Sequence, residues 1–191
     1  VYGPARTGLS GPLSDQERAL GIVQLLVRLY APLPRQSLGY LISLCGYGAP
    51  GLQTELRLAL KELEDGWLAS AKVEGLNYLW PADEPPDQIA PPGIRLMAPF
   101  DPLVWDRRRF AHLHGWAYRF EAYTPSAKRT MGYYALPLLH AGKAVGWANL
   151  SVSGGELHSD VGLIAGVRRT AAFERALKAE LERYGAFLGL A

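Results

Sequence analysis

Basic and aromatic side chains alternate over residues 95–134, and this mixture suits binding to nucleic acid. Residues 95–129 contain seven basic and three acidic residues, which gives a net charge of +4. Lysine and arginine bind phosphates, and exposed rings stack on unpaired bases. In the alternative interpretation, most of these rings belong to a hydrophobic core. The candidate DNA-binding residues of this stretch are Arg107, Arg108, Arg109, Lys128, Arg129 and Tyr133.

Three consecutive arginines follow Asp106 in the segment FDPLVWDRRRF. Successive residues of a helix point about 100° apart, so the three arginines cannot all engage one partner. We expect one to pair with Asp101 or Asp106, leaving one or two for solvent or phosphate. Asp106 is expected to cap a short helix. The apolar residues before it are expected to anchor the junction in a core: Phe100, Leu103, Val104 and Trp105.

A second polar face belongs to a helix that is expected to begin near Pro50. In a winged helix, the third helix enters the major groove and presents its polar face to bases and phosphates. Acidic residues at 55, 62, 64 and 65 on the same helix would oppose phosphate, so a scaffolding or protein-contact role is the alternative. The candidate DNA-binding residues on this face are Gln53, Thr54, Arg57 and Lys61.

The elements of residues 1–80 occur in the order of a winged helix. The sequence SDQE at Ser14 to Glu17 matches a capping box and predicts a helix over residues 15–30. Breaks at APLP and GYGAPG bound a second helix over residues 37–45. After the third helix, the segments WLASAKVEG and LNYLWP predict a β-hairpin.

A proline-rich segment separates this part from a second domain. Residues 81–93 contain five prolines and little to bury, which predicts a linker between domains at 1–80 and 94–191. Strands are expected at 94–98, 118–123, 133–140, 143–153 and near 157–163, and a final helix would pack Phe173, Leu177 and Leu181 onto the sheet. The fold class is therefore α+β, with a winged helix followed by a curved β-sheet or partial β-barrel and a C-terminal helix.

Other kinds of site find little support in the sequence. Cys45 is the only cysteine, which excludes an internal disulfide and fits a reducing, cytoplasmic setting. His112 and His114 lack a nearby third ligand, so we expect no metal, and no phosphate-binding or dinucleotide-binding fingerprint indicates a cofactor. No recognisable catalytic constellation and no membrane-spanning segment are present.

As an ordered set, three segments resemble the C-terminal half of the YcaQ/AlkZ family of winged-helix DNA glycosylases. The segments are RLMAPFDPLVWDRRR, YRFEAYTPSAKRTMGYYALPLL and GKAVGWANL. One departure is Trp147, where the family pattern leads us to expect arginine or another polar residue. The residues that match the family pattern are Pro99 to Arg107, Tyr123, Pro125, Lys128, Arg129, Gly132, Tyr133, Tyr134 and Gly146.

The resemblance implies binding to double-stranded DNA and a part in the repair of alkylated or crosslinked DNA. The family's catalytic signature, a Gln, an apolar residue and then Gln or Asp, does not occur in this sequence. We therefore expect either a piece of a longer glycosylase, whose N-terminal region would be its partner, or a shortened relative without catalytic activity. The alternatives are a winged-helix transcriptional regulator with a ligand-sensing second domain and a structural module.

Overall fold

The first helix, α1 (Asp15–Tyr30), begins and ends where the sequence predicts. The structure is a computed structural model that describes residues 13–84 and 89–190. In it the Ser14 hydroxyl accepts a hydrogen bond from the Glu17 N–H, and the Glu17 carboxylate accepts one from the Ser14 N–H at 2.8 Å. These bonds satisfy donors that a helix N-terminus otherwise leaves open, so the predicted capping box is confirmed.

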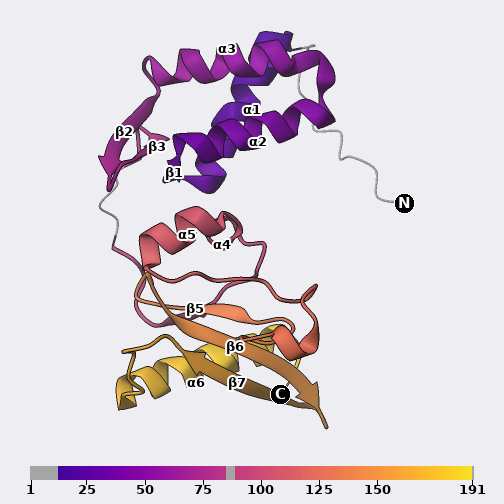
Figure 1. Cartoon of the computed structure of the whole chain (residues 1–191), viewed down its shortest axis with the longest axis vertical. Helices are drawn as coiled ribbons and strands as arrows, with labels where there is room; N and C mark the ends of the chain where they lie inside the picture. The colour runs from indigo at the N-terminus through magenta and orange to yellow at the C-terminus, as the bar shows by residue number, and fades with distance from the viewer. Residues whose placement is uncertain (1–12, 85–88, 191) are drawn as a thin grey trace. The chain divides into compact units, whose positions relative to one another are not determined.

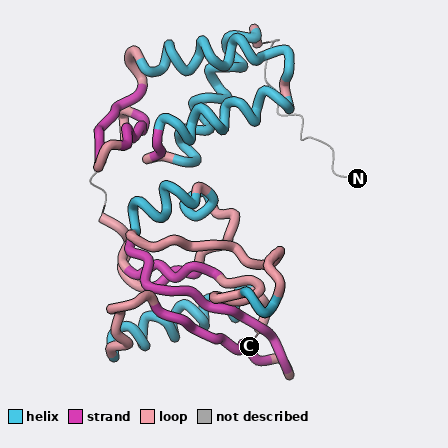
Figure 2. Tube along the Cα trace, viewed as in Figure 1, coloured by secondary structure: helices cyan, strands magenta, loops and turns pink. Residues whose placement is uncertain are grey.

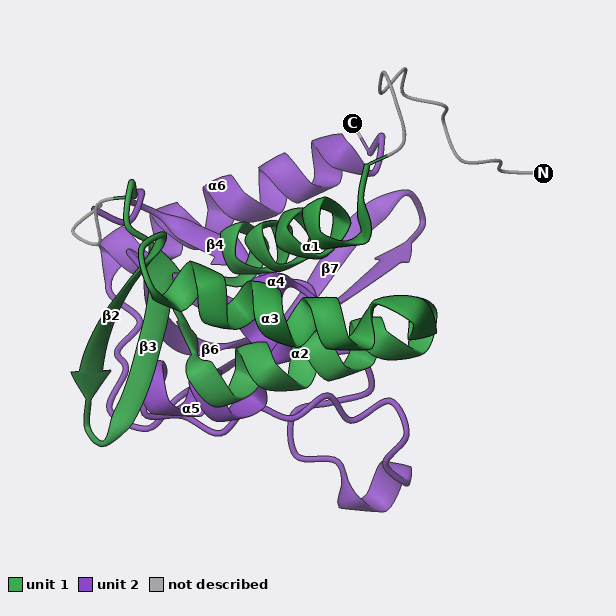
Figure 3. Ribbon diagram, turned by 90° about the horizontal axis from the view of Figure 1, so that it is seen from above, with its two compact units in different colours: residues 1–86 green, residues 87–191 purple. Residues whose placement is uncertain are grey.

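Two more helices occur among the described residues, 13–84, of the first compact unit, which spans residues 1–86 (Figure 3). Helix α2 (Arg35–Gly48) is longer than expected, because Gly46 and Gly48 weaken a helix without ending it. A 3₁₀ turn, η1 (Pro50–Leu52), leads into α3 (Gln53–Glu64). The buried side chains of these helices form the core: Val23, Val27, Leu38, Leu56 and Leu63.

The first unit also contains a three-stranded antiparallel sheet (Figure 1). The predicted hairpin is confirmed, and its turn at Glu74 and Gly75 has two positive φ angles, 46° and 89°, as tight hairpin turns require. The strand order is β1-β3-β2. The strands are β1 (Leu33–Pro34), β2 (Leu68–Val73) and β3 (Leu76–Pro81).

Arg28 of α1 holds the residues that follow β3. Its guanidinium donates to Asp83 at 3.0 Å and to Glu84 at 2.6 Å, and it lies 5.2 Å from the centre of the Trp67 ring. The hydrogen bond to Asp83 raises the pKa of Arg28. Two acids of the predicted linker therefore belong to the first unit, while residues 85–88 of that linker lie outside the described residues.

The second unit, residues 87–191, is built on an open antiparallel sheet (Figure 2). Its strand order is β4-β5-β6-β7, so β4 and β7 are the edges and the described residues form no closed barrel. Together the two units confirm an α+β fold. The strands are β4 (Ile94–Leu96), β5 (Leu136–His140), β6 (Lys143–Ser153) and β7 (Glu156–Leu163).

Helices cover both faces of this sheet. Because neighbouring strand residues point to opposite faces, Leu138 packs toward α6 (Ala171–Phe187) and Leu139 packs toward the other side. Phe173 and Leu177 of α6 fill the first face, as the sequence predicts. The second face is covered by α4 (Pro102–Trp105), by α5 (Arg107–His114) and by the residues after α5.

Two expectations for this unit are wrong. Residues 118–123 form no strand, because Glu121 turns inward and binds backbone N–H groups of residues 130–132, which folds the segment back on itself. Of the four expected anchors around α4, Val104 is fully buried, but Phe100 is 65% exposed and Leu103 is 47% exposed. The turn of α4 begins at Asp101, which caps it by accepting the Leu103 N–H at 2.9 Å.

Candidate nucleic-acid interface

Residues 123–134 form a loop before β5 that we call the basic loop. It contains a short 3₁₀ turn, η2 (Ser126–Lys128), and it carries Lys128, Arg129 and Tyr133, three residues of the predicted site. Lys128 and Tyr133 are exposed, and Arg129 is half-buried. The chain therefore presents these three side chains from one short segment.

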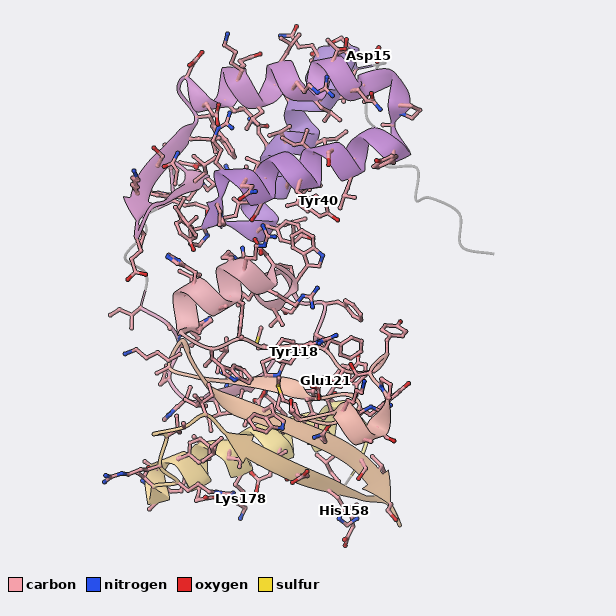
Figure 4. All side chains as sticks on the ribbon, viewed as in Figure 1. Asp15, Tyr40, Tyr118, Glu121, His158 and Lys178 are labelled. Atoms are coloured by element: carbon pink, nitrogen blue, oxygen red, sulfur yellow. The ribbon has the colours of Figure 1, made fainter. Side chains whose placement is uncertain are left out.

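A buried carboxylate determines the shape of the basic loop. Glu121 is only 4% exposed, and Figure 4 shows it on the irregular segment beside the sheet. One of its oxygens accepts the N–H groups of Thr130 and Met131 at 2.8 Å each, and that of Gly132 at 3.3 Å. Its other oxygen accepts the Thr130 hydroxyl at 2.9 Å. Four donors of the loop thus end on one side chain.

The environment of Glu121 favours its charged form at neutral pH. Burial raises the pKa of this carboxyl, but the hydrogen bonds from Met131, Thr130 and Gly132 lower it by more, so the net shift is downward. A charged acceptor forms stronger hydrogen bonds than a neutral one. The ionised carboxylate therefore stabilises the closed loop at neutral pH.

Gly132 and Asn149 fix the end of the loop near β5. The Asn149 amide donates to the Met131 carbonyl at 2.7 Å. Gly132 has a φ angle of 119°, and a Cβ atom there would lie 2.4 Å from the Asn149 side chain. Only glycine fits this backbone conformation and this space.

Arg129 contacts both the loop backbone and an aromatic ring. Its Nε donates to the Thr124 carbonyl at 2.8 Å, and its guanidinium lies 5.0 Å from the centre of the Tyr133 ring. A guanidinium over a ring face is attracted by the ring's quadrupole. These contacts orient Arg129 and Tyr133 together.

One of the three arginines of α5 turns inward and two face solvent, as the sequence predicts, but the inward one, Arg109, binds a backbone carbonyl where pairing with Asp101 or Asp106 was expected. Asp106 caps α5 by accepting the N–H groups of Arg108 and Arg109 at 3.1 Å, which confirms the predicted cap. Arg109 is 2% exposed, and its guanidinium donates to the Pro102 carbonyl. Its assignment to the phosphate-contacting residues was therefore wrong, whereas Arg107 and Arg108 are exposed.

In the first unit, the predicted polar face of α3 lies at the surface: Gln53, Thr54, Arg57 and Lys61 are exposed. Two of the acids that would oppose phosphate are engaged elsewhere. Glu62 accepts from Gln16 of α1 at 3.3 Å, and Glu64 pairs with Arg35 of α2 at 2.5 Å. Their charges thus serve contacts between helices.

Trp147 has a structural explanation. It lies opposite Gly162 in the register of β6 and β7, and a Cβ at Gly162 would collide with the Trp147 ring at 2.2 Å. The Trp147 ring is also stacked on the ring of Trp116, with 6.0 Å between the two ring centres. The indole covers a glycine of the neighbouring strand, a place where an arginine would leave apolar surface open.

Neither a groove on the second unit nor its histidines form a more convincing site. A groove of about 610 Å³ lies between β7 and α6, but Arg169 pairs there with Glu174 at 2.5 Å, and Lys178 pairs with Glu182 at 3.8 Å. The Nδ1 atom of His114 accepts the Ala144 N–H at 3.3 Å, and burial lowers the pKa of this imidazole. Within residues 13–84 and 89–190, no cluster of His, Cys, Asp or Glu could hold a metal ion. In those ranges, no helix is long and apolar enough to cross a membrane.

Glu121 and Asn149 hold the backbone of the basic loop, and the sequence did not lead us to predict either role. The available signal was charge, because Glu121 is the one acid of residues 107–155, all of which are described. An isolated acid within a basic and aromatic segment indicates an internal acceptor. Asn149 gave no comparable signal, since its role depends on the position of Gly132.

The chain combines a helical unit that carries an antiparallel hairpin with a sheet that carries a basic, aromatic surface, and a surface of this composition suits binding to nucleic acid. The sequence model of the AlkZ-like DNA glycosylase family matches residues 1–187, so the chain belongs to that family.

A solved structure gives a more particular comparison. The fold is similar to that of the Streptomyces sahachiroi DNA glycosylase AlkZ, with a TM-score of 0.53 and 20% sequence identity. The similarity covers 92% of this chain and 45% of that one. This chain therefore corresponds to less than half the length of the solved glycosylase.

Proposed function

We propose that this chain is the DNA-binding part of an AlkZ-like glycosylase that repairs alkylated or crosslinked DNA, and that it holds the phosphates of double-stranded DNA. The observation that carries the proposal is the basic loop, where Lys128, Arg129 and Tyr133 stand on a backbone fixed by the buried Glu121. A preorganised cationic loop binds phosphate with little loss of conformational entropy.

The first unit would act as a winged helix. Three helices followed by an antiparallel hairpin support this assignment, as does the exposed polar face of α3. In such a domain α3 would enter the major groove with Gln53, Thr54, Arg57 and Lys61. The ion pair of Glu64 with Arg35 of α2 offsets the repulsion that this acid would exert on phosphate.

Arg107 and Arg108 would add phosphate contacts from α5. Both lie in the first turn of that helix, where the interaction of a positive charge with the helix dipole is unfavourable and costs about 0.3–1 kcal/mol for each arginine. Helix stability therefore does not account for them, and an anionic partner would.

Chemistry would come from other residues of the glycosylase. The Gln, apolar residue, Gln or Asp signature of the resembled family is absent from this sequence. We propose that residues carrying this signature, in the N-terminal region of the same protein, perform base excision. The single cysteine supports a cytoplasmic setting, and the division into a winged helix, a linker over 81–93 and a second domain is part of the same proposal.

The test is charge reversal in the basic loop. The 191-residue chain carrying Lys128→Glu and Arg129→Glu is compared with the unchanged chain for binding to labelled duplex DNA at several salt concentrations. Two lost phosphate contacts should weaken binding about tenfold or more and reduce the slope of log Kd against log salt by about two. Lys128→Glu alone changes only an exposed side chain and should reduce the slope by about one.

A matched control uses Arg175→Glu with Lys178→Glu, an equal charge change on α6 (Figure 4 labels Lys178). This control should retain most of the affinity and the full salt slope. The proposal fails if duplex binding by the unchanged chain is insensitive to salt, or if the loop and control variants weaken binding equally.

A further inference from the structure

An aromatic cluster that includes the first and last residues of the basic loop takes no part in the proposed contact with duplex phosphates. It consists of Phe100, Phe120, Tyr123 and Tyr134, which we call the aromatic platform. Phe120 is its centre, with near-perpendicular ring contacts to Phe100 at 5.2 Å, Tyr123 at 6.2 Å and Tyr134 at 5.1 Å. Rings joined in this way orient one another.

The platform is at the surface. Tyr123 is 91% exposed, and Phe100 and Tyr134 are also exposed, while Phe120 is half-buried beneath them. Contiguous exposed rings of this kind mark a binding surface, because water contact with so much apolar area is unfavourable. The platform therefore needs a partner that presents flat apolar faces or apolar side chains.

The charges near the platform distinguish a partner with flat apolar faces from one with apolar side chains. Residues 107–155 are all described, and Glu121 is their only acid. It is buried and bound to four donors of the basic loop, whereas Arg119 and Lys128 of the same stretch are exposed. Asp101, which follows Phe100, is engaged as the cap of α4. Exposed rings with cations, in a stretch whose only acid is buried, favour an anionic partner that carries flat faces.

We propose that the aromatic platform binds unpaired DNA nucleotides by stacking on their bases. This inference rests on the proposed function and extends it from duplex phosphates to DNA whose bases are exposed, as at an opened or distorted lesion. Base–ring stacking tolerates any sequence, and Arg129, whose guanidinium lies over Tyr133 in the same loop, would supply a cation for the adjoining phosphates. Because Glu121 fixes the loop, Tyr123 and Tyr134 are positioned before DNA arrives.

The experiment compares three labelled DNA probes of one length with the full 191-residue chain. The first probe is a perfect duplex, and the second carries a short single-stranded gap. The third carries the same gap, but the unpaired nucleotides in it are abasic. Stacking predicts tighter binding to the gapped duplex than to the perfect duplex. It also predicts that the chain shows no such preference for the abasic gap, since that probe retains the phosphates but lacks the bases on which the rings would stack.

Variants then assign the preference to the platform. Tyr123→Ala removes a ring that contributes little to folding because it is 91% exposed, and it should lower the preference for the gap by about fivefold or more. Phe187→Ala, which removes an exposed ring on α6, is the matched control and should leave the preference unchanged. Melting temperatures of both variants should stay close to that of the unchanged chain.

Three results would overturn the inference: equal affinity for gapped and perfect duplex, equal affinity for the gap with and without bases, or an unchanged preference in Tyr123→Ala. Each of these can occur while duplex binding remains salt-dependent and sensitive to Lys128, which would leave the proposed function standing. Loss of the charge-reversal effect would instead remove the proposed function.

Discussion

Replacing Glu121 by glutamine should loosen the basic loop without changing its composition or its outward charges. The glutamine carbonyl can occupy the position of the oxygen that accepts from Thr130, Met131 and Gly132. Its NH₂ group can then donate to the Thr130 hydroxyl, so the hydrogen-bonding pattern survives. What is lost is the negative charge of the acceptor.

The magnitude follows from the two short bonds. A hydrogen bond to a charged group contributes about 1.5–3 kcal/mol and a neutral one about 0.5–1.5 kcal/mol, a difference of about 1 kcal/mol for each of the 2.8 Å contacts. Removing a buried charge also relieves its desolvation, which offsets part of the loss. We expect Glu121→Gln to reduce the free energy of unfolding of the second unit by about 1–2 kcal/mol.

The loss should depend on pH. The pKa of Glu121 in the folded protein lies below its ordinary value of 4.5, so the contribution of the carboxylate is complete above that pH and disappears as pH falls through the folded pKa. Glutamine does not titrate. The difference in stability between the two proteins should therefore be constant near neutral pH and shrink in the acid range below about 4.5.

Chemical denaturation measures this difference, and amide hydrogen exchange at residues 130–132 locates it. Glu156→Gln, an exposed glutamate at the start of β7, is the matched control and should change stability by no more than about 0.5 kcal/mol. Equal stability and equal exchange in Glu121→Gln and the unchanged chain would refute the view that the carboxylate holds the loop. DNA affinity should fall with the loop order, although every phosphate-contacting side chain is still present.

Two other substitutions test the supports of the second unit. Gly132→Ala should destabilise the second unit by about 1–3 kcal/mol, because the backbone is strained for any L side chain and the new Cβ meets Asn149. Denaturation midpoints measure this loss, and the variant Asn149→Gly, which should fold normally, checks whether the contact with Asn149 is its cause. Glu180→Ala should lower the melting temperature by about 10 °C, because it leaves the part-buried Leu96 N–H without the buried carboxylate that accepts it at 2.7 Å. An unchanged melting curve would exclude the contact.

Local signals in the sequence predicted much of this fold. The capping box at Ser14 and the cap at Asp106 depend on residues three or fewer positions apart, so their patterns specify helix starts directly. Strand β6 was predicted with its observed bounds because its mainly apolar residues lie between two turns, at residues 141–142 and 154–155. These elements are determined by neighbours in the sequence.

Features that depend on distant residues were not predictable. The alternation of Tyr118 and Phe120 matches a strand, but Tyr118 is buried with its hydroxyl donating to the Ala135 carbonyl, and Glu121 binds amides ten residues further on. Burial raises the pKa of Tyr118, which keeps that hydroxyl a donor. Which of three arginines would turn inward likewise depended on where the Pro102 carbonyl came to lie.

Glu180 not only attaches α6 to β4 but also protects the edge of the sheet. Strand β4 is an edge of the sheet, and the Leu96 N–H points away from β5, toward the side where another chain could add a strand. The carboxylate of Glu180 occupies that donor, and it is itself held by Arg183 at 2.7 Å and 2.8 Å. The same side chain that anchors a helix thus blocks intermolecular strand pairing at this edge, which protects the protein from aggregation.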